Sequence, residues 1–152
     1  MSLTWFSKHH SELDKAELYA LLALRNRVFV VEQECPYQEL DGQDLCGDTC
    51  HLLAWRDGAL AAYLRLLDPA TQDGEVVIGR VATAPEARGA GLGHELMERA
   101  LQVCAARWPG LPIYLSAQAH LQSYYGRHCF VPVTEVYLED DIPHIGMRRA
   151  AP

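Results

Sequence analysis

The amino-acid sequence predicts one mixed α/β domain. Three observations predict it: β-branched runs alternate with helical patterns, two apolar runs flank the turn dipeptide Asp57-Gly58, and a glycine-rich turn connects a strand pattern to a helical one. The 152 residues, of which 49% are hydrophobic, can bury a substantial core but are too few for two ordinary domains. We therefore expect residues 1–152 to form a single domain.

The N-terminal half is predicted to contain a long helix, a long loop and a hairpin. After an early strand, apolar residues recur at helical spacing and predict a helix over residues 12–31. Pro36 and the polar stretch that ends at Asp48 predict the loop. Asp57-Gly58 readily supplies the positive φ angles of a two-residue turn, so the apolar runs beside it are expected to pair as a hairpin.

The C-terminal half is predicted to alternate strands with helices. The β-branched run EVVIGRVAT, residues 75–83, indicates a strand. An apolar helical face begins at Leu92, and Pro109 ends that helix. The remaining elements are a strand over residues 111–117, a short helix over 119–128, and two strands near 130–138 and 144–149.

Composition excludes several classes of protein. The formal charge of −7 opposes binding to nucleic acid, whose phosphates repel an acidic surface. The first residues lack a secretion signal and no apolar stretch approaches about 18 residues, so we expect a cytoplasmic protein that does not bind membranes. The five cysteines, odd in number and irregularly spaced, favour reduced thiols over a disulfide framework.

Acidic residues are concentrated between Phe29 and Trp55, where no lysine or arginine occurs. Such a segment would attract a cationic ligand, and it would equally serve as a solvated acidic loop. The acidic residues concerned are Glu32, Glu34, Glu39, Asp41, Asp44 and Asp48.

The most informative segment is VIGRVATAPEARGAGLGHELMERAL, in which a strand leads through a proline turn into three alternating glycines and an amphipathic helix. Glycine lets the backbone approach an anion, and backbone N–H groups at a helix N-terminus bind phosphate. A P-loop would need GxxxxGK[ST], and a dinucleotide fingerprint would need GxGxxG with a later acidic residue; neither occurs. We therefore expect an anion-binding loop at Arg88-Gly89-Ala90-Gly91-Leu92-Gly93.

The pattern R-G-x-G-x-G, after a strand that ends in V-A-T-x-P, resembles the acetyl-CoA signature of the GNAT superfamily. The segments VFVVEQECPYQELDGQD, GRVAT, AQAHLQSYYGRHCF and EDDIPHIGM together resemble its ElaA-like branch. The resemblance spans nearly the whole chain. It implies a GNAT fold, a mixed sheet of about six to seven strands with helices on both faces.

The resemblance also implies an acetyl-CoA-dependent N-acetyltransferase that moves the acetyl group directly to a primary amine. The backbone amides of Arg88, Gly89, Ala90, Gly91, Leu92 and Gly93 would bind the pyrophosphate, and the strand edge Val81-Ala82-Thr83 would bind the pantetheine arm. Tyr125 matches the family's tyrosine in F-Y-x-x-x-G-F and would protonate the departing thiolate. This chain departs from that pattern because Cys129 stands in place of the usual glycine and Gly126 falls inside the short helix.

The group that deprotonates the amine is not evident, because the strand VVIGRVAT carries no carboxylate. The histidine best placed in the sequence is His120, although helical spacing turns it away from Tyr125. Each candidate residue could instead serve only to stabilise the fold. The candidates are Glu34, Glu39, Asp41, Asp44, His51, His120 and His144, of which Glu34, Glu39, Asp41 and His120 are expected on the substrate side.

Three further points concern partners and alternatives. Cys46-x3-Cys50-His51 has no second ligand pair, so we expect no metal. The expected partner is a small or peptidic amine acceptor, and exposed strand edges near the C-terminus favour a homodimer. The missing carboxylate leaves a second hypothesis open, a non-catalytic acyl-CoA-binding sensor or interaction module on the same fold.

Overall fold

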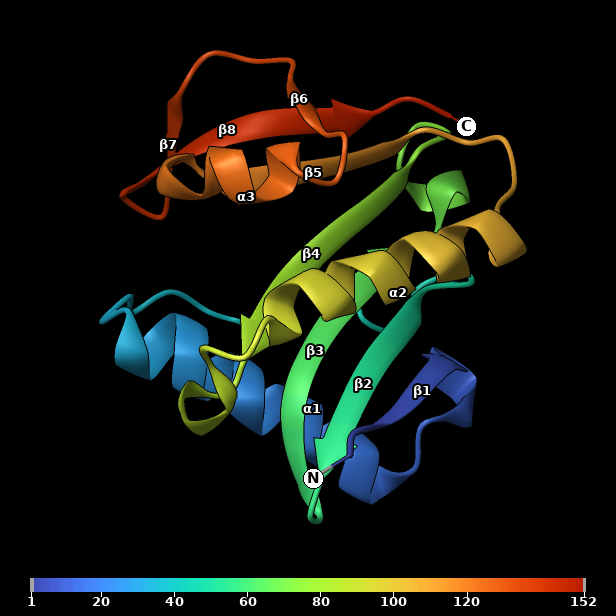
Figure 1. The fold of residues 1–152 in the computed structure, drawn as a ribbon, viewed down its shortest axis with the longest axis vertical. Coiled ribbons are helices and arrows are strands. Elements are labelled where there is room, and N and C mark those ends of the chain that lie inside the picture. Colours follow the sequence, from blue (N-terminus) through green and yellow to red (C-terminus); the bar gives the residue numbers. More distant parts are fainter. Residues whose placement is uncertain (1, 152) are drawn as a thin grey trace.

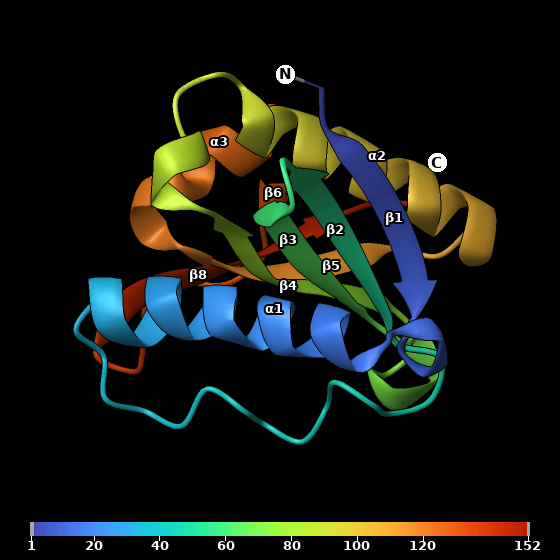
Figure 2. The ribbon, with the colours of Figure 1, turned by 90° about the horizontal axis from the view of Figure 1, so that it is seen from below.

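One mixed β-sheet runs through the molecule and carries helices on both of its faces (Figures 1 and 2). The computed structural model describes residues 2–151. Its strands follow the order β1-β2-β3-β4-β5-β8-β6, with β7 paired to β8, and only β4 and β5 are parallel neighbours. The strands are β1 (Thr4–His9), β2 (Cys50–Arg56), β3 (Ala59–Leu67), β4 (Val76–Thr83), β5 (Ile113–Gln118), β6 (Val131–Pro132), β7 (Tyr137–Glu139) and β8 (Ile142–Arg149).

The predicted fold class is confirmed, with eight strands in the sheet. The extra strand arises where the sequence predicted one strand near residues 130–138. That region forms β6 and β7 instead, because the side chain of Thr134, rather than a backbone carbonyl, accepts the N–H of Gly146 on β8 and interrupts the ladder. Both short strands pair with β8.

Helix α1 (Lys15–Arg25) covers one face of the sheet, and α2 (Leu92–Arg107) and α3 (Gln122–Gly126) cover the other (Figure 2). The side chain of Asp14 caps α1 by accepting from the backbone N–H of Glu17, so the α-helix begins later than predicted. A π-helical turn over Asn26–Glu32 continues it. The predicted helix over residues 12–31 is therefore α1 followed by this wider turn.

The predicted hairpin is β2–β3. Asp57 and Gly58 have φ angles of 53° and 77°, as a two-residue turn of this kind requires. Almost every side chain of both strands is buried, because α1 and α2 cover the opposite faces of this part of the sheet. The hairpin thus forms the centre of the core.

The strands β4 and β5 pair only at their beginnings. The ladder joins residues 76–78 to 113–115, and beyond Ile78 the two strands diverge (Figure 1). A bulge accompanies the divergence, because two residues of β4, Arg80 and Val81, oppose a single residue of β3. Arg80 has a φ angle of 54° there.

Helix α2 begins directly after the glycine-rich loop and buries one apolar face against β3 and β4. It ends at Arg107, shortly before Pro109, as predicted. Its buried residues are Leu92, Leu96, Met97, Ala100 and Cys104. Within residues 2–151, no helix combines the length and apolar character that crossing a bilayer demands.

Candidate active site

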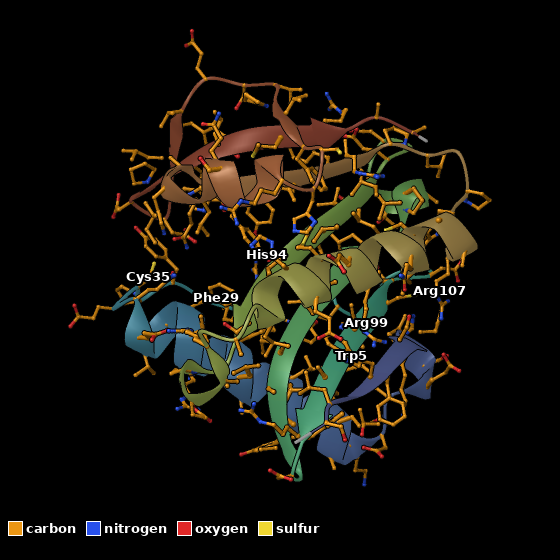
Figure 3. The ribbon with its side chains drawn as sticks, in the orientation of Figure 1. Trp5, Phe29, Cys35, His94, Arg99 and Arg107 are labelled. Atoms are coloured by element: carbon orange, nitrogen blue, oxygen red, sulfur yellow. The ribbon has the colours of Figure 1, made fainter. Side chains whose placement is uncertain are left out.

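A cavity of about 320 Å³ opens where β4 and β5 diverge. Its walls come from both strands, from α3, from β8 and from the end of the π-helical turn. Phe29 and Cys35, which belong to this lining, lie next to the C-terminal end of α1 (Figure 3). Residues of helical elements on both faces of the sheet line the cavity, among them Phe29 of the π-helical turn and Tyr125 of α3.

The glycine-rich loop sits at the N-terminus of α2. Gly89 and Gly91 have φ angles of 94° and 74°, and Gly91 caps the helix. A side chain is disfavoured at such angles, although no protein atom lies within 4 Å of where a Cβ would stand. The loop therefore exposes its backbone at the positive end of a helix, which is the arrangement that binds phosphate.

Arg88 makes a contact that the sequence did not predict. Its guanidinium forms two hydrogen bonds of 2.7 Å with the carboxylate of Glu32, and its Nε donates to the carbonyl oxygen of Thr83 at 3.2 Å. A second bidentate pair joins Arg27 to Glu86 nearby. These pairs fasten the loop to the π-helical turn.

The predicted pantetheine strand has one unpaired edge. From Gly79 to Thr83, β4 pairs with β3 alone, and the ladder to β5 has already ended. Val81 lines the cavity, while Ala82 is buried in the core. An extended ligand can hydrogen-bond to such an edge as an added strand would.

Tyr125 is buried, with 6% of its surface exposed, and lines the cavity. Within residues 2–151 its hydroxyl has no hydrogen-bond partner, and burial raises its pKa. The neighbouring Tyr124 donates a hydrogen bond to the carbonyl oxygen of Gly93 and packs edge-on against Tyr125. Tyr124 thereby ties α3, the short helix that carries Tyr125, to the first turn of α2.

The residues expected on the substrate side divide into two groups. Glu39 and Asp41 line the cavity, whereas Glu34 and His120 are exposed and lie outside its lining. His120 lies in a 3-10 turn, and its side chain is exposed to solvent. It therefore does not lie on the substrate side of the cavity, where the sequence predicted it.

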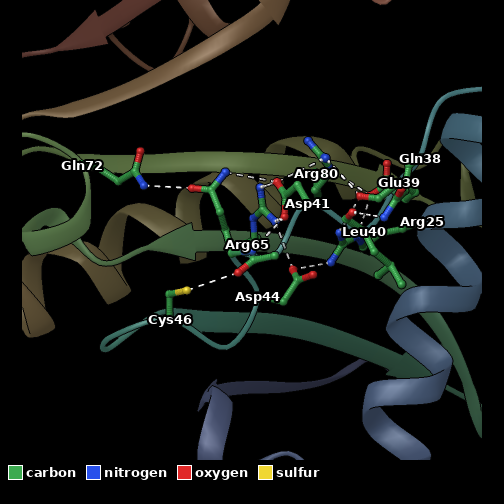
Figure 4. A network of polar contacts seen from close by, with 12 residues as sticks. Arg25, Gln38, Glu39, Leu40, Asp41, Asp44, Cys46, Arg65, Gln72 and Arg80 are labelled. Carbon is green, nitrogen blue, oxygen red and sulfur yellow. Dashed lines mark hydrogen bonds and ion pairs between the residues drawn. The ribbon is translucent and has the colours of Figure 1, made fainter.

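Arginine side chains pair with the cavity-lining carboxylates (Figure 4). Glu39 accepts hydrogen bonds from Nε of Arg25 at 2.8 Å and Nε of Arg80 at 2.7 Å. Asp41 accepts two bonds of 2.9 Å from Arg65. Burial alone would raise the pKa of Asp41, but the hydrogen bonds and charge of Arg65 outweigh it and lower that pKa to about 2.

Asp44 completes the network, because it accepts from both Arg25 and Arg65. His51, a candidate base, is buried behind it, where Nε2 contacts the Asp44 carbonyl and Nδ1 contacts Tyr63. Burial lowers the pKa of His51 to about 4. Asp44 and His51 thus belong to a buried polar network, and neither of them lines the cavity.

The acidic segment is therefore charge-compensated rather than a free anionic surface. Glu32, Glu39, Asp41 and Asp44 all form ion pairs with arginines, and the sequence showed no basic residue within the segment itself. The hypothesis that this segment attracts a cationic ligand is not supported by this geometry.

The β7–β8 hairpin contributes acidic residues that sequence reasoning missed. Glu139 and Asp140 line the cavity, as does His144, which the sequence named only as one of several candidate bases. The hairpin is held by a hydrogen bond of 3.0 Å from the Tyr37 hydroxyl to Asp141. The segment EDDIPHIGM could have indicated this hairpin, because its two adjacent aspartates separate two strand-forming stretches.

In the described residues, 2–151, no group of three or more histidine, cysteine, aspartate or glutamate side chains is arranged to hold a metal ion.

Comparison with known proteins assigns the family. The sequence model described as an acetyltransferase (GNAT) domain matches residues 14–151. The chain belongs to the GNAT acetyltransferase family. It is 53% identical to protein ElaA of Escherichia coli (strain K12) over 147 residues, which are 97% of this chain and 96% of ElaA.

Two crystal structures share this GNAT fold closely. One is an acyl-CoA N-acyltransferase from Pseudomonas aeruginosa, 70% identical, with a TM-score of 0.96 over 98% of this chain and 100% of that one. The other is E. coli ElaA, 52% identical, with a TM-score of 0.93 over 97% and 99% of the two chains. The ElaA-like assignment is thus confirmed.

Proposed function

We propose that this GNAT protein transfers an acetyl group from acetyl-CoA directly to a primary amine of a small or peptidic acceptor in the cytoplasm. The observation that carries the proposal is the position of Tyr125, a buried phenol on the cavity wall, on the short helix that Tyr124 ties to the first turn of α2.

The donor half of the site would use backbone groups. Gly89 and Gly91 expose their amides at the N-terminus of α2, where the pyrophosphate of acetyl-CoA would bind. The pantetheine arm would pair with the free edge of β4 at Val81 and would compete with Arg88 for the carbonyl oxygen of Thr83. This path leads the thioester to the divergence of β4 and β5, where the cavity opens.

Besides the exchange of bonds at the acyl carbon, the nitrogen of a charged amine must lose two protons and the sulfur of CoA must gain one. A bond forms from the amine nitrogen to the acyl carbon, the carbon–sulfur bond breaks, and the sulfur receives a proton. Tyr125 would donate that proton, since burial raises the pKa of its phenol and keeps it protonated at neutral pH. It then recovers one of the protons that the nitrogen loses.

The acceptor would enter from the side of α1 and the β7–β8 hairpin. A protonated amine fits this wall, because Glu139 and Asp140 line it and, unlike Glu39 and Asp41, form no ion pair with an arginine in the described residues. A cationic acceptor is therefore proposed on the strength of the hairpin carboxylates and not of the acidic segment.

The test is Tyr125→Phe, with transfer followed by release of the CoA thiol across a panel of amines. General acid catalysis contributes about 10²- to 10⁴-fold, so the turnover number should fall by about 10²-fold or more while CoA affinity stays unchanged. Tyr19→Phe is the matched control, because Tyr19 is 79% exposed on α1. Unchanged turnover in Tyr125→Phe would remove this tyrosine from the mechanism.

A second function, an acyl-CoA-binding sensor, is favoured by one observation. β4 carries no carboxylate that could deprotonate an amine. Tight CoA binding without amine-dependent thiol release in the same panel would support the sensor over the enzyme.

A further inference from the structure

We infer that His144 is the general base that deprotonates the acceptor amine and that Glu139 positions and stabilises it. The inference rests on the proposed acetyl transfer. It selects one general base from the several candidates that the sequence left open. His144 lies on β8, opposite Gln118 at the end of β5, and lines the same cavity as Tyr125.

A backbone contact fixes the tautomer of His144. Its Nδ1 lies 2.7 Å from the carbonyl oxygen of Ile142, which can only accept a hydrogen bond. In the neutral ring Nδ1 therefore carries the hydrogen, and Nε2 has the free lone pair. A base needs this arrangement, with the orienting contact on one nitrogen and the reactive lone pair on the other.

Glu139 lies beside the reactive nitrogen. Its Oε2 is 3.6 Å from His144 Nε2, and Tyr137 packs against the imidazole with the ring planes 29° apart. With the ring neutral, two hydrogen-bond acceptors stand 3.6 Å apart on the cavity wall. A protonated amine has several N–H donors and satisfies both of them, and the carboxylate then stabilises the imidazolium that forms.

The β7–β8 turn explains why these side chains meet. Asp140 and Asp141 have φ angles of 51° and 62° and form a two-residue turn. The register pairs Tyr137 with His144 and Glu139 with Ile142, which places Glu139 and His144 on one face as diagonal neighbours.

The other ionisable groups of the cavity are less suited to act as the base. Glu39 and Asp41 are held by arginines, and the phenol of Tyr125 has a raised pKa. Asp140 is a carboxylate on the same wall, and its side chain has no orienting contact in the described residues. The titratable groups that share the wall near His144 are Cys35, Tyr37, Tyr114, Tyr125, Glu139 and Asp140.

The proton balance assigns each transfer. The protonated amine loses two protons as it becomes an amide: one passes to Nε2 of His144 and on to solvent, and the other replaces the proton that Tyr125 gives to sulfur. The base is therefore needed only for an amine that arrives charged. An amine that is already neutral bypasses it.

The experiment compares two probe amines in His144→Gln and wild type, with acetyl-CoA as donor and thiol release as readout. Propylamine is charged at neutral pH and methoxyamine is not. We expect kcat/KM to fall by about 10²-fold for propylamine and by only a few-fold for methoxyamine, with CoA affinity unchanged. His120→Gln, an exposed histidine outside the cavity, should match wild type with both amines.

The outcomes separate the inference from the proposed function. Equal losses for both amines, or no loss, overturn the assignment of His144 while acetyl transfer stands. A wild-type protein that binds CoA but acetylates neither probe nor any amine of the panel overturns the proposed function and its base together. Loss confined to Asp140→Asn would transfer the role to that carboxylate and overturn the inference.

Glu139 has a separate readout that does not depend on the folding of the histidine variant. In Glu139→Gln kcat/KM should fall several-fold for propylamine and stay near the wild-type value for methoxyamine, because the charged amine and the imidazolium lose their anionic neighbour. Glu139→Asp should restore most of the wild-type activity with propylamine. Equal kcat/KM values in Glu139→Gln and wild type for propylamine contradict the role of Glu139.

Discussion

Replacing Cys129 by glycine should stabilise the protein. Cys129 has a φ angle of 68°, in the left-handed region, and follows the short helix α3. Its N–H donates to the carbonyl of Gly126, and the N–H of Phe130 donates to the carbonyl of Tyr125. These two bonds form a Schellman motif, in which the position of Cys129 favours glycine. This is the position at which the motif F-Y-x-x-x-G-F, which this segment resembles, has glycine.

The magnitude follows from two opposing costs. The left-handed conformation costs an L-residue about 1–2 kcal/mol. Glycine loses more backbone entropy on folding, which costs about 0.5–1 kcal/mol. Cys129 is exposed and fills no part of the core, so the net gain in the free energy of unfolding should be about 1 kcal/mol. For a chain of this size that gain raises Tm by about 2–4 °C.

Urea unfolding followed by circular dichroism measures the difference, with the slope m unchanged and the midpoint raised. Cys129→Ala is the matched control, because it removes the thiol but keeps the Cβ that makes the conformation costly. It should lie within about 0.5 kcal/mol of wild type. If the glycine variant were no more stable than the alanine variant, the strain argument would be refuted.

Two further predictions concern acid stability and association. Because the pKa of Asp41 is lowered from 3.8 to about 2, its ion pairs should contribute about 2 kcal/mol above pH about 4, and this stability should disappear as pH falls toward about 2. Urea unfolding at several acidic pH values should show a weaker acid dependence in Asp41→Asn, and identical pH dependence in both proteins would contradict it. Val131 and Leu138, 57% and 69% exposed at the open end of the sheet, are proposed to join two copies of the chain. Light scattering should then show a wild-type dimer and a Leu138→Lys monomer, and a monomeric wild type would exclude the interface.

Local patterns predicted the elements that depend on neighbouring residues. Asp57-Gly58 predicted the central hairpin, and the glycine-rich turn predicted the start of α2. The same reasoning could have found the β7–β8 turn, since Asp140-Asp141 also separates two strands with two residues. The sequence patterns predicted strands near 130–138 and 144–149 on either side of this dipeptide but did not identify it as a two-residue turn.

Long-range contacts of the site were beyond sequence reasoning. Glu39 meets Arg80 from 41 positions away, and Glu32 meets Arg88 from 56 positions away. Neither arginine has a pattern that indicates its partner, because side-chain pairing across a sheet depends on how the strands and the loop are placed. The acidic segment therefore seemed to be a free surface until its partners were located.

The 33–49 segment contains neither helix nor strand, yet arginines of α1, β3 and β4 hold it in place. Its shape depends on a few side-chain anchors and not on a continuous backbone ladder. Substitutions between the anchored residues should therefore leave the sheet and the glycine-rich loop undisturbed. Variants that keep Arg25, Arg65 and Arg80 should keep the path of this segment while the part of the cavity wall that it forms changes.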